Sequence, residues 1–186
     1  SAPHIKHRLP IGLRPAEAGD RANPGHWEAD LMLFARHGQV ILALHERCSR
    51  LVAVVRQPNK AAAPVAAALQ TLLAPLPEKL RQTIAFDNGT EFALHYALRH
   101  ELGIQTFFCD PHAPWQKGGI ENAIGRLRRR LPRKTDLATL SPARLRQIAS
   151  LYNHTPRKCL DFQTPAEVFL QLLHFKCEST PPLSLG

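Results

Sequence analysis

Five short apolar runs have the length and composition of β-strands. They lie at residues 27–34, 40–46, 51–56, 81–86 and 104–108. The first three follow one another across the short polar segments 37–38 and 48–50, which predicts an antiparallel meander. The last two are each preceded by a helix-like segment, which predicts right-handed crossovers to parallel strands.

Apolar residues at intervals of three and four predict the helices between and after these strands. The helical segments span residues 59–74 and 91–101, begin again near residue 119, and recur twice beyond residue 132. Gly103 ends the second of them. Ser141 before Pro142 marks a helix start, and Thr164 with Glu167 forms a capping box. The third helix carries an apolar stripe of Ile120, Ile124, Leu127 and Leu131.

This order of elements predicts an α/β protein. Its mixed sheet combines a three-strand antiparallel meander with two parallel strands, and helices flank it. We expect four segments along the chain, which are an irregular lead-in (1–24), a core (25–135), a C-terminal helical extension (136–176) and a loose tail (177–186).

Composition and charge narrow the class of protein. The 186 residues are 44% hydrophobic and 21% charged, as in ordinary globular proteins. Charges interrupt every apolar run well before the ~20 residues that a membrane span needs. The 24 Lys and Arg against 15 Asp and Glu give a net charge of +9, which points to a polyanionic partner such as nucleic acid; a generic basic surface is the alternative.

The cysteines and histidines give weaker signals. The four cysteines, Cys48, Cys109, Cys159 and Cys177, are far apart in sequence, so we expect reduced thiols and not a disulfide framework. Several His and Cys pairs have two intervening residues, a spacing also used by zinc sites. Such pairs arise easily by chance among ten histidines, and zinc is therefore a minor alternative.

Three acidic residues fall where the predicted topology would bring them together. Asp30 lies within the first strand, Asp87 ends the fourth, and Glu121 lies in the first turn of the third helix. Each has an ordinary alternative. Glu28 points to the same face as Asp30 and competes with it, Asp87 could serve a turn, and Glu121 could complement the helix dipole.

A cluster of three carboxylates has a defined chemical use. Mg²⁺ and Mn²⁺ prefer oxygen ligands and are commonly held by a few carboxylates together with substrate phosphate. Two such ions, ~3.5–4 Å apart, can activate the attacking oxygen and stabilise the leaving oxygen at phosphorus. The cluster in a basic chain therefore indicates metal-dependent chemistry on a nucleic acid.

Four ordered motifs carry a family resemblance. They are GHWEAD at 25–30, FDNGTEF at 86–92, DPHAPWQKGGIEN at 110–122, and YNHTPRKCL at 152–160 followed by TPAEVF at 164–169. Together they resemble the catalytic core of DDE transposases related to retroviral integrases, and more narrowly a group of bacterial insertion-sequence transposases. One departure is Ile120, where this group often has Asn before the catalytic Glu.

The resemblance implies a ribonuclease-H-like catalytic core with a C-terminal helical extension. It also implies a metal triad in which Asp30 bridges two Mg²⁺ or Mn²⁺ ions while Asp87 and Glu121 hold one each. The implied partners are transposon-end and target DNA, in a homodimer or larger synaptic assembly. A helix-turn-helix module is expected upstream, so the chain would be part of a longer bacterial, cytoplasmic, nucleoid-associated protein with no membrane partner.

A basic segment next to the triad is the expected DNA surface. Residues 117–134 hold seven basic side chains and one acid. Arg128 shares a helix face with Glu121 and is expected to contact phosphate, with Gly125 allowing close approach. Trp115 could stack on an unpaired base or plug its loop onto the core. The expected DNA-binding residues are Trp115, Lys117, Arg126, Arg128, Arg129, Arg130, Arg133 and Lys134.

Two other functions remain open from the sequence. One is a non-catalytic DNA-binding module on a transposase fold, and the other is a structure-specific nuclease of the same fold.

Asn88 and Gly89 are assigned to the turn after the fourth strand, where glycine tolerates a left-handed backbone.

Overall fold

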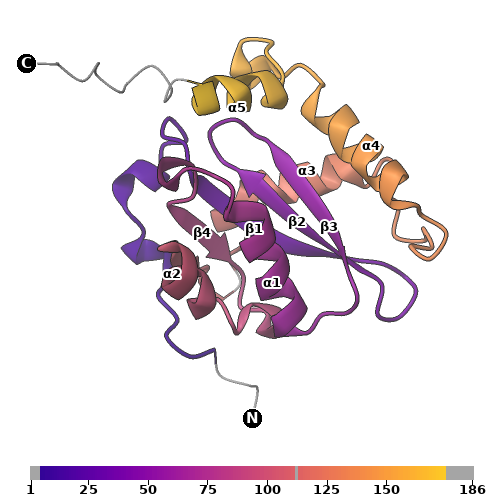
Figure 1. Ribbon diagram of the computed structural model, residues 1–186, viewed down its shortest axis with the longest axis horizontal. Helices are drawn as coiled ribbons and strands as arrows, with labels where there is room; N and C mark the ends of the chain where they lie inside the picture. The colour runs from indigo at the N-terminus through magenta and orange to yellow at the C-terminus, as the bar shows by residue number, and fades with distance from the viewer. Residues whose placement is uncertain (1–4, 112, 175–186) are drawn as a thin grey trace, which may run out of the picture.

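A five-stranded mixed sheet forms the centre of the computed structural model, which describes residues 5–111 and 113–174 (Figure 1). The strands are β1 (His26–Leu33), β2 (Val40–Glu46), β3 (Val52–Gln57), β4 (Thr83–Phe86) and β5 (Gln105–Phe108). Their order in the sheet is β3-β2-β1-β4-β5. β1, β2 and β3 pair antiparallel, whereas β1 with β4 and β4 with β5 pair parallel. The predicted fold class is confirmed.

Helices cover both faces of the sheet, with α1 in front and α3 behind it in Figure 1. The α-helices are α1 (Ala62–Leu73), α2 (Tyr96–Leu102), α3 (Gly118–Leu127), α4 (Pro142–Asn153) and α5 (Pro165–His174). Short 3₁₀ helices are η1 (Ile11–Leu13), η2 (Ala16–Ala18), η3 (Glu78–Leu80), η4 (Thr90–Phe92), η5 (Pro114–Lys117) and η6 (Lys158–Leu160). None of the described helices combines the length and apolar character that crossing a membrane requires.

Alternation along β1 assigns its side chains to the two faces. Trp27 and Leu31 pack into the cluster that includes α1, and Met32 packs into the cluster beneath α3. Because successive side chains of a strand point to opposite faces, Glu28 and Asp30 lie on the α3 face with Met32. The acidic residues of β1 are thus directed towards the helix that carries Glu121.

Helix α4 packs onto the β3 side of the sheet. Leu145 and Ile148 of α4 join the cluster beneath α3. Asn153 also bonds to the β3 backbone, accepting from Val52 N at 2.9 Å and donating to Val52 O at 2.8 Å. This pair covers part of the exposed edge of the sheet.

Both predicted helix caps are present. Ser141 Oγ accepts a hydrogen bond from Arg144 N at 3.1 Å. Thr164 Oγ1 accepts from Glu167 N at 3.2 Å, while Thr164 N donates to Glu167 Oε2 at 2.7 Å. These bonds satisfy backbone donors that have no partner within the helix.

Replacement of Ser141 by Ala should lower the free energy of unfolding by about 1 kcal/mol, since Arg144 N loses its acceptor. Chemical denaturation followed by circular dichroism measures the change. Thr71→Ala, at an exposed position inside α1, is the control and should stay within about 0.5 kcal/mol. A neutral Ser141→Ala variant would contradict the capping role.

Two predicted helices have different bounds. The one expected over residues 91–101 is broken into η4 and α2, because Phe92 turns inward and its ring stacks on Phe86 at 4.5 Å between centroids. His95 then bonds Thr106 Oγ1 through its Nδ1 at 2.7 Å. The third helix ends at Leu127, earlier than the stripe through Leu131 predicted, although Leu131 is fully buried.

Pro132 prevents the helix from resuming beyond Leu131. Pro132 disfavours a helical backbone at the residue before it and offers no N–H to a continuing helix. A turn, in which Leu131 N donates to Leu127 O, therefore carries Leu131 into the core. The predicted tail, 177–186, lies outside the described residues.

Candidate active site

Asp30 and Asp87 are brought together by the parallel pairing of β1 and β4. The register sets Glu28 opposite Ala85, and two residues further along it sets Asp30 level with Asp87. The turn after β4 is held by two bonds: Gly89 N donates to Asp87 Oδ1, and Asn88 Nδ2 donates to Cys109 O, both at 2.9 Å. Two of the three predicted carboxylates therefore share one edge of the sheet.

Lys117 occupies the space between these two carboxylates. Its Nζ lies 3.0 Å from Asp30 Oδ2 and 3.6 Å from Asp87 Oδ2, and the residue is 4% exposed. Burial alone would lower the pKa of Lys117, but the charges of Asp30 and Asp87 outweigh it and raise the pKa above its usual value. A buried, charged ammonium group is thus held at this site.

The carboxyl group of Asp30 is strongly desolvated. Burial raises its pKa, the charge of Lys117 opposes the rise, and the nearby charge of Asp87 adds to it. Asp30 Oδ1 also accepts from Leu31 N at 2.7 Å. An ionised carboxylate in these surroundings is stabilised by any further positive charge nearby, because little water is present to screen the attraction.

Glu91 is a further acid at this edge that the sequence interpretation did not single out. Burial raises its pKa, and the charges of Asp87 and Asp30 contribute to the rise. Gly89 has φ −67°, so the predicted left-handed turn is wrong. A Cβ at Gly89 would lie 2.5 Å from Glu91 Cδ, so a larger residue there would force the Glu91 carboxyl group to shift. The only sequence signal for Glu91 is its place in the FDNGTEF motif.

Glu121 is placed in the first turn of α3 and is exposed. It makes no ion pair or side-chain hydrogen bond with the rest of the described chain. Within residues 5–111 and 113–174, no three His, Cys, Asp or Glu side chains lie close enough to hold a metal ion together. The three predicted carboxylates are therefore not assembled in this conformation, and Glu121 is the one that stands apart.

Glu28 fixes the start of α3 next to the aspartates. Its carboxylate is 1% exposed, accepts from Ile120 N at 2.7 Å and pairs with Arg47 Nε at 3.2 Å. A Cβ at Gly119 would come within 2.8 Å of Glu28 Oε2, so only glycine lets the helix approach this closely. Glu28 and Asp30 thus have different partners: Glu28 anchors the helix and Asp30 meets the ammonium group.

His45 beside Glu28 is neutral at ordinary pH. Burial, followed by the charges of Arg50, Arg21 and Arg47, lowers its pKa to about 3. Its Nδ1 lies 4.0 Å from Glu28 Oε2, too far for a hydrogen bond. Arg47 is therefore the cation that balances the buried Glu28 carboxylate.

Glu28→Gln should lower the free energy of unfolding by about 1–3 kcal/mol, because it leaves the buried Arg47 without its counter-charge. Glu28→Ala also removes the acceptor for Ile120 N and should cost about 3–5 kcal/mol. Denaturant unfolding measures both variants. Glu78→Gln, at an exposed position in η3, should change stability by less than about 0.5 kcal/mol. If the two Glu28 variants were as stable as Glu78→Gln, Glu28 would not anchor the start of α3.

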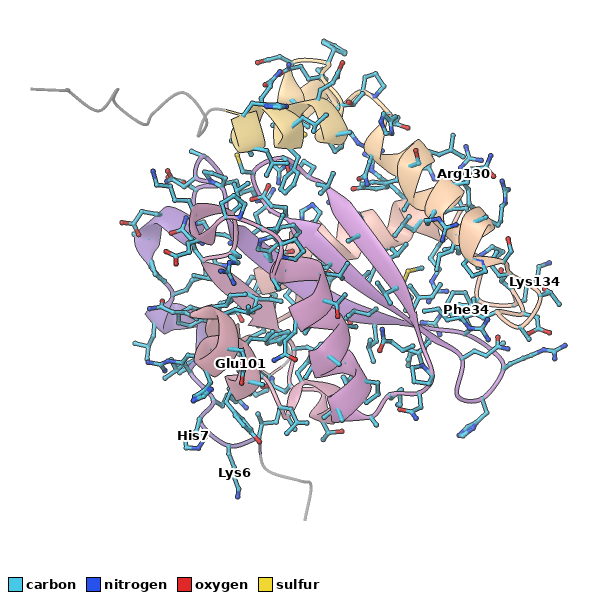
Figure 2. All side chains as sticks on the ribbon, viewed as in Figure 1. Lys6, His7, Phe34, Glu101, Arg130 and Lys134 are labelled. Atoms are coloured by element: carbon cyan, nitrogen blue, oxygen red, sulfur yellow. The ribbon has the colours of Figure 1, made fainter. Side chains whose placement is uncertain are left out.

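The expected DNA-binding residues fall into three groups. Trp115 is 74% exposed and does not fill the core. Arg128 packs its guanidinium over the Phe34 ring at 4.7 Å and donates to Leu33 O at 2.8 Å, and Lys117 is held by the aspartates. The remaining basic residues are exposed along the end of α3 and the segment after it, where Figure 2 labels Arg130 and Lys134. These are Arg126, Arg129, Arg130, Arg133 and Lys134.

The described cysteines Cys48, Cys109 and Cys159 are free thiols. Burial raises the pKa of Cys109 to about 11, so this thiol stays protonated. Cys177 lies outside the described residues, as do His4 and His112. The pairs His4/His7, Cys109/His112 and His174/Cys177, which have two intervening residues, each include one of these residues, so the zinc alternative stays untested at these pairs.

Comparison with solved structures defines the class of fold. The catalytic core domain of BIV integrase superposes with a TM-score of 0.63, covering 83% of this chain and 99% of that domain at 24% identity. The chain therefore has the ribonuclease-H-like fold of an integrase catalytic core. No protein-family model matches the chain.

Comparison of sequences carries the assignment further. The chain is 43% identical to the transposase of insertion sequence element IS1086 from Cupriavidus metallidurans, over 91% of the chain and 50% of that protein. It is 36% identical to transposase InsI of IS30A from Escherichia coli, over 89% of the chain and 43% of that protein. The chain thus spans about half the length of these relatives. It is a transposase/integrase-like core, and the resemblance predicted from the motifs is confirmed.

Proposed function

We propose that the chain is the catalytic domain of a DNA transposase. It cleaves DNA at the ends of a mobile element and then uses the freed 3′-hydroxyl to attack target DNA. The observation that carries the proposal is a pair of carboxylates, the desolvated Asp30 and the partly exposed Asp87, held around a single cation at the carboxyl end of β4 and the neighbouring part of β1. The insertion-sequence relatives supply the class of substrate.

The side chains at this edge fit a divalent metal site. Carboxylate oxygens are the ligands that Mg²⁺ and Mn²⁺ prefer, and the Lys117 ammonium shows that a cation is stable between Asp30 and Asp87. When bound, two such ions activate the attacking oxygen and stabilise the leaving oxygen of an in-line displacement at phosphorus. In the proposal Asp30, Asp87 and Glu121 would hold these ions.

Glu121 joins the site in this proposal through the position of α3. It follows Lys117 by four residues, which is about one helical turn. The bond between Glu28 and Ile120 N holds the preceding residue of the same helix above β1. Glu121 then turns towards the aspartates as the ammonium group of Lys117 leaves them.

DNA is the proposed partner along α3 and the segment that follows it. The exposed arginines and Lys134 contact phosphates, and Trp115 stacks on an unpaired base near the cleaved bond. Lys117 and Arg128 join these contacts only after leaving their present partners. We also propose that a homodimer or larger assembly acts on DNA, and that the part of the relatives beyond this chain includes a helix-turn-helix module. In this proposal residues 25–135 form the catalytic core, and 136–176 form a helical extension of it.

The test is strand cleavage and joining in Mg²⁺ or Mn²⁺, with the protein that contains this core and DNA bearing the element's ends. Joined products that require the metal support the proposal. Cleavage of branched DNA without joining would favour a structure-specific nuclease instead. DNA binding with no heat of Mn²⁺ binding at millimolar metal would favour a non-catalytic DNA-binding module.

A further inference from the structure

A groove of about 440 Å³ lies between the end of α3 and α4. Its α3 side presents Arg126, Arg129 and Arg130, and its other side presents Tyr152, Thr155 and Arg157. Figure 2 shows Arg130 at the α4 side of the molecule. The two sides come from segments that are far apart in sequence, and the fold alone gathers their four arginines around one groove.

Arg157 is positioned in the wall of this groove. The residue is 8% exposed, its guanidinium lies 4.3 Å from the centroid of the Tyr152 ring, and its Nη2 donates to Tyr152 O at 3.0 Å. Its buried Nε has no acceptor within the described part of the chain. A buried guanidinium N–H without an acceptor is costly, so a shift of Arg157 that opened its Nε to an oxygen from outside the chain would be favourable.

The positive charges of the groove are not balanced by the protein. None of the described residues that line it is acidic, and none of its four arginines forms an ion pair with the described residues. Burial lowers the pKa of Arg157, and the charge of Arg126 lowers it further although Tyr152 opposes this. Four guanidinium groups around one groove repel one another, and a bound anion would relieve that repulsion.

We propose that this groove binds the phosphodiester backbone of DNA, with Arg157, held against Tyr152, contacting one phosphate and the arginines at and after the end of α3 contacting neighbouring phosphates. The proposal rests on the proposed function, which makes DNA the substrate. Planar guanidinium groups suit phosphate because they donate two parallel hydrogen bonds.

The position of the groove on α3 favours DNA over a free anion. Arg126 follows Glu121 by five residues, about 7.5 Å along the helix axis. Phosphates of one strand advance by about 3.4 Å per base step along a duplex, so the groove begins about two steps from Glu121. Five residues also turn about 140° around the helix axis, so a DNA backbone that reaches both Glu121 and the groove would pass around α3.

The experiment measures binding of a fluorescent DNA duplex to the 186-residue chain between 50 and 200 mM salt. Arg126→Ala with Arg130→Ala should weaken binding by on the order of tenfold per residue at 0.1 M salt. It should also reduce the slope of log K against log salt by about 2. Arg157→Lys keeps the charge but loses the planar donor pair, and should weaken binding severalfold. Arg99→Ala with Lys79→Ala, exposed on α2 and η3, removes the same charge elsewhere and should change binding far less.

The outcomes separate the groove from the rest of the proposal. The proposal that the groove binds DNA would be overturned if folded arginine variants kept the wild-type affinity and salt slope. It would also be overturned if the groove variants and the control variants lost the same amount of DNA affinity. Circular dichroism and the thermal midpoint establish that the variants are folded. If the wild-type protein binds DNA through the groove but never cleaves it, the proposed function fails and the binding site stands. If it cleaves DNA while the groove variants bind normally, only the groove is wrong.

Discussion

Asp87→Asn should abolish metal-dependent strand cleavage while leaving the fold intact. The amide keeps an oxygen for Gly89 N but loses the charge that would hold the metal ion. Loss of residues that merely support metal ligands costs about 10- to 100-fold, so loss of a ligand should cost more than about 100-fold in rate. The same variant should bind Mn²⁺ more weakly in calorimetry. Glu121→Gln should lower cleavage by a similar factor if Glu121 completes the site.

Matched controls are available for both substitutions. Asp161→Asn lies in an exposed turn at φ 50°, a backbone conformation that Asn adopts readily, and Glu101→Gln lies on the exposed face of α2. Both should cleave at the wild-type rate. Full activity of Asp87→Asn would reject its metal role, and full activity of Glu121→Gln would show that a different third acid serves, with Glu91 as the nearest candidate.

Lys117→Met should bind Mn²⁺ more tightly than the wild-type chain. In the wild type a divalent ion must displace an ammonium group that two carboxylates hold, and the variant has no such competitor. We expect the Kd for Mn²⁺ to fall on the order of tenfold, which corresponds to about 1.4 kcal/mol. Without metal the variant should lose about 2 kcal/mol of stability. That is less than the roughly 3–5 kcal/mol for a fully buried pair, since the Asp30 and Asp87 side chains are 23% and 42% exposed.

Calorimetry and thermal unfolding with and without Mn²⁺ measure these two effects directly. Lys79→Met, on the exposed surface of η3, removes the same charge away from the site and should change neither. Weaker Mn²⁺ binding by Lys117→Met would mean that the lysine organises the carboxylates for the metal and does not compete with it.

Local patterns were sufficient to predict the sheet from the sequence. Alternating apolar runs, short polar breaks and helix caps act over a few residues, so the strands and the Ser141 and Thr164 caps were placed within a residue or two. The prediction of one continuous helix over residues 91–101 was wrong, because the chain is divided into η4 and α2 where the ring of Phe92 stacks on Phe86. That contact joins separate elements and has no periodic signal.

The site was only partly predictable for a similar reason. The alternation of side chains along the first strand predicted that Glu28 and Asp30 lie on the same face of the sheet. It could not distinguish their roles, because these depend on which of the two contacts the first turn of α3. Lys117 was expected to face DNA, because nothing in a basic segment shows that one lysine turns back beneath two aspartates. Arg157 belonged to a recognised motif, yet its groove exists only after α4 has packed beside α3.

Glu28 and Asp30 are two residues apart on β1. The position of α3, which Glu28 holds, is therefore linked to the position of the Asp30 carboxylate in the candidate active site. Two residues of a strand span about 6.6 Å, and this interval cannot stretch without breaking the pairing of β1 with β2 and β4. The helix is therefore positioned relative to the aspartates through the buried side chain of Glu28, whose distance from Asp30 along β1 is fixed by the strand. In the proposed complex with DNA, a tilt of the far end of α3 would pivot about the hydrogen bond between Ile120 N and Glu28 and would also rotate Glu121, the next residue of the helix.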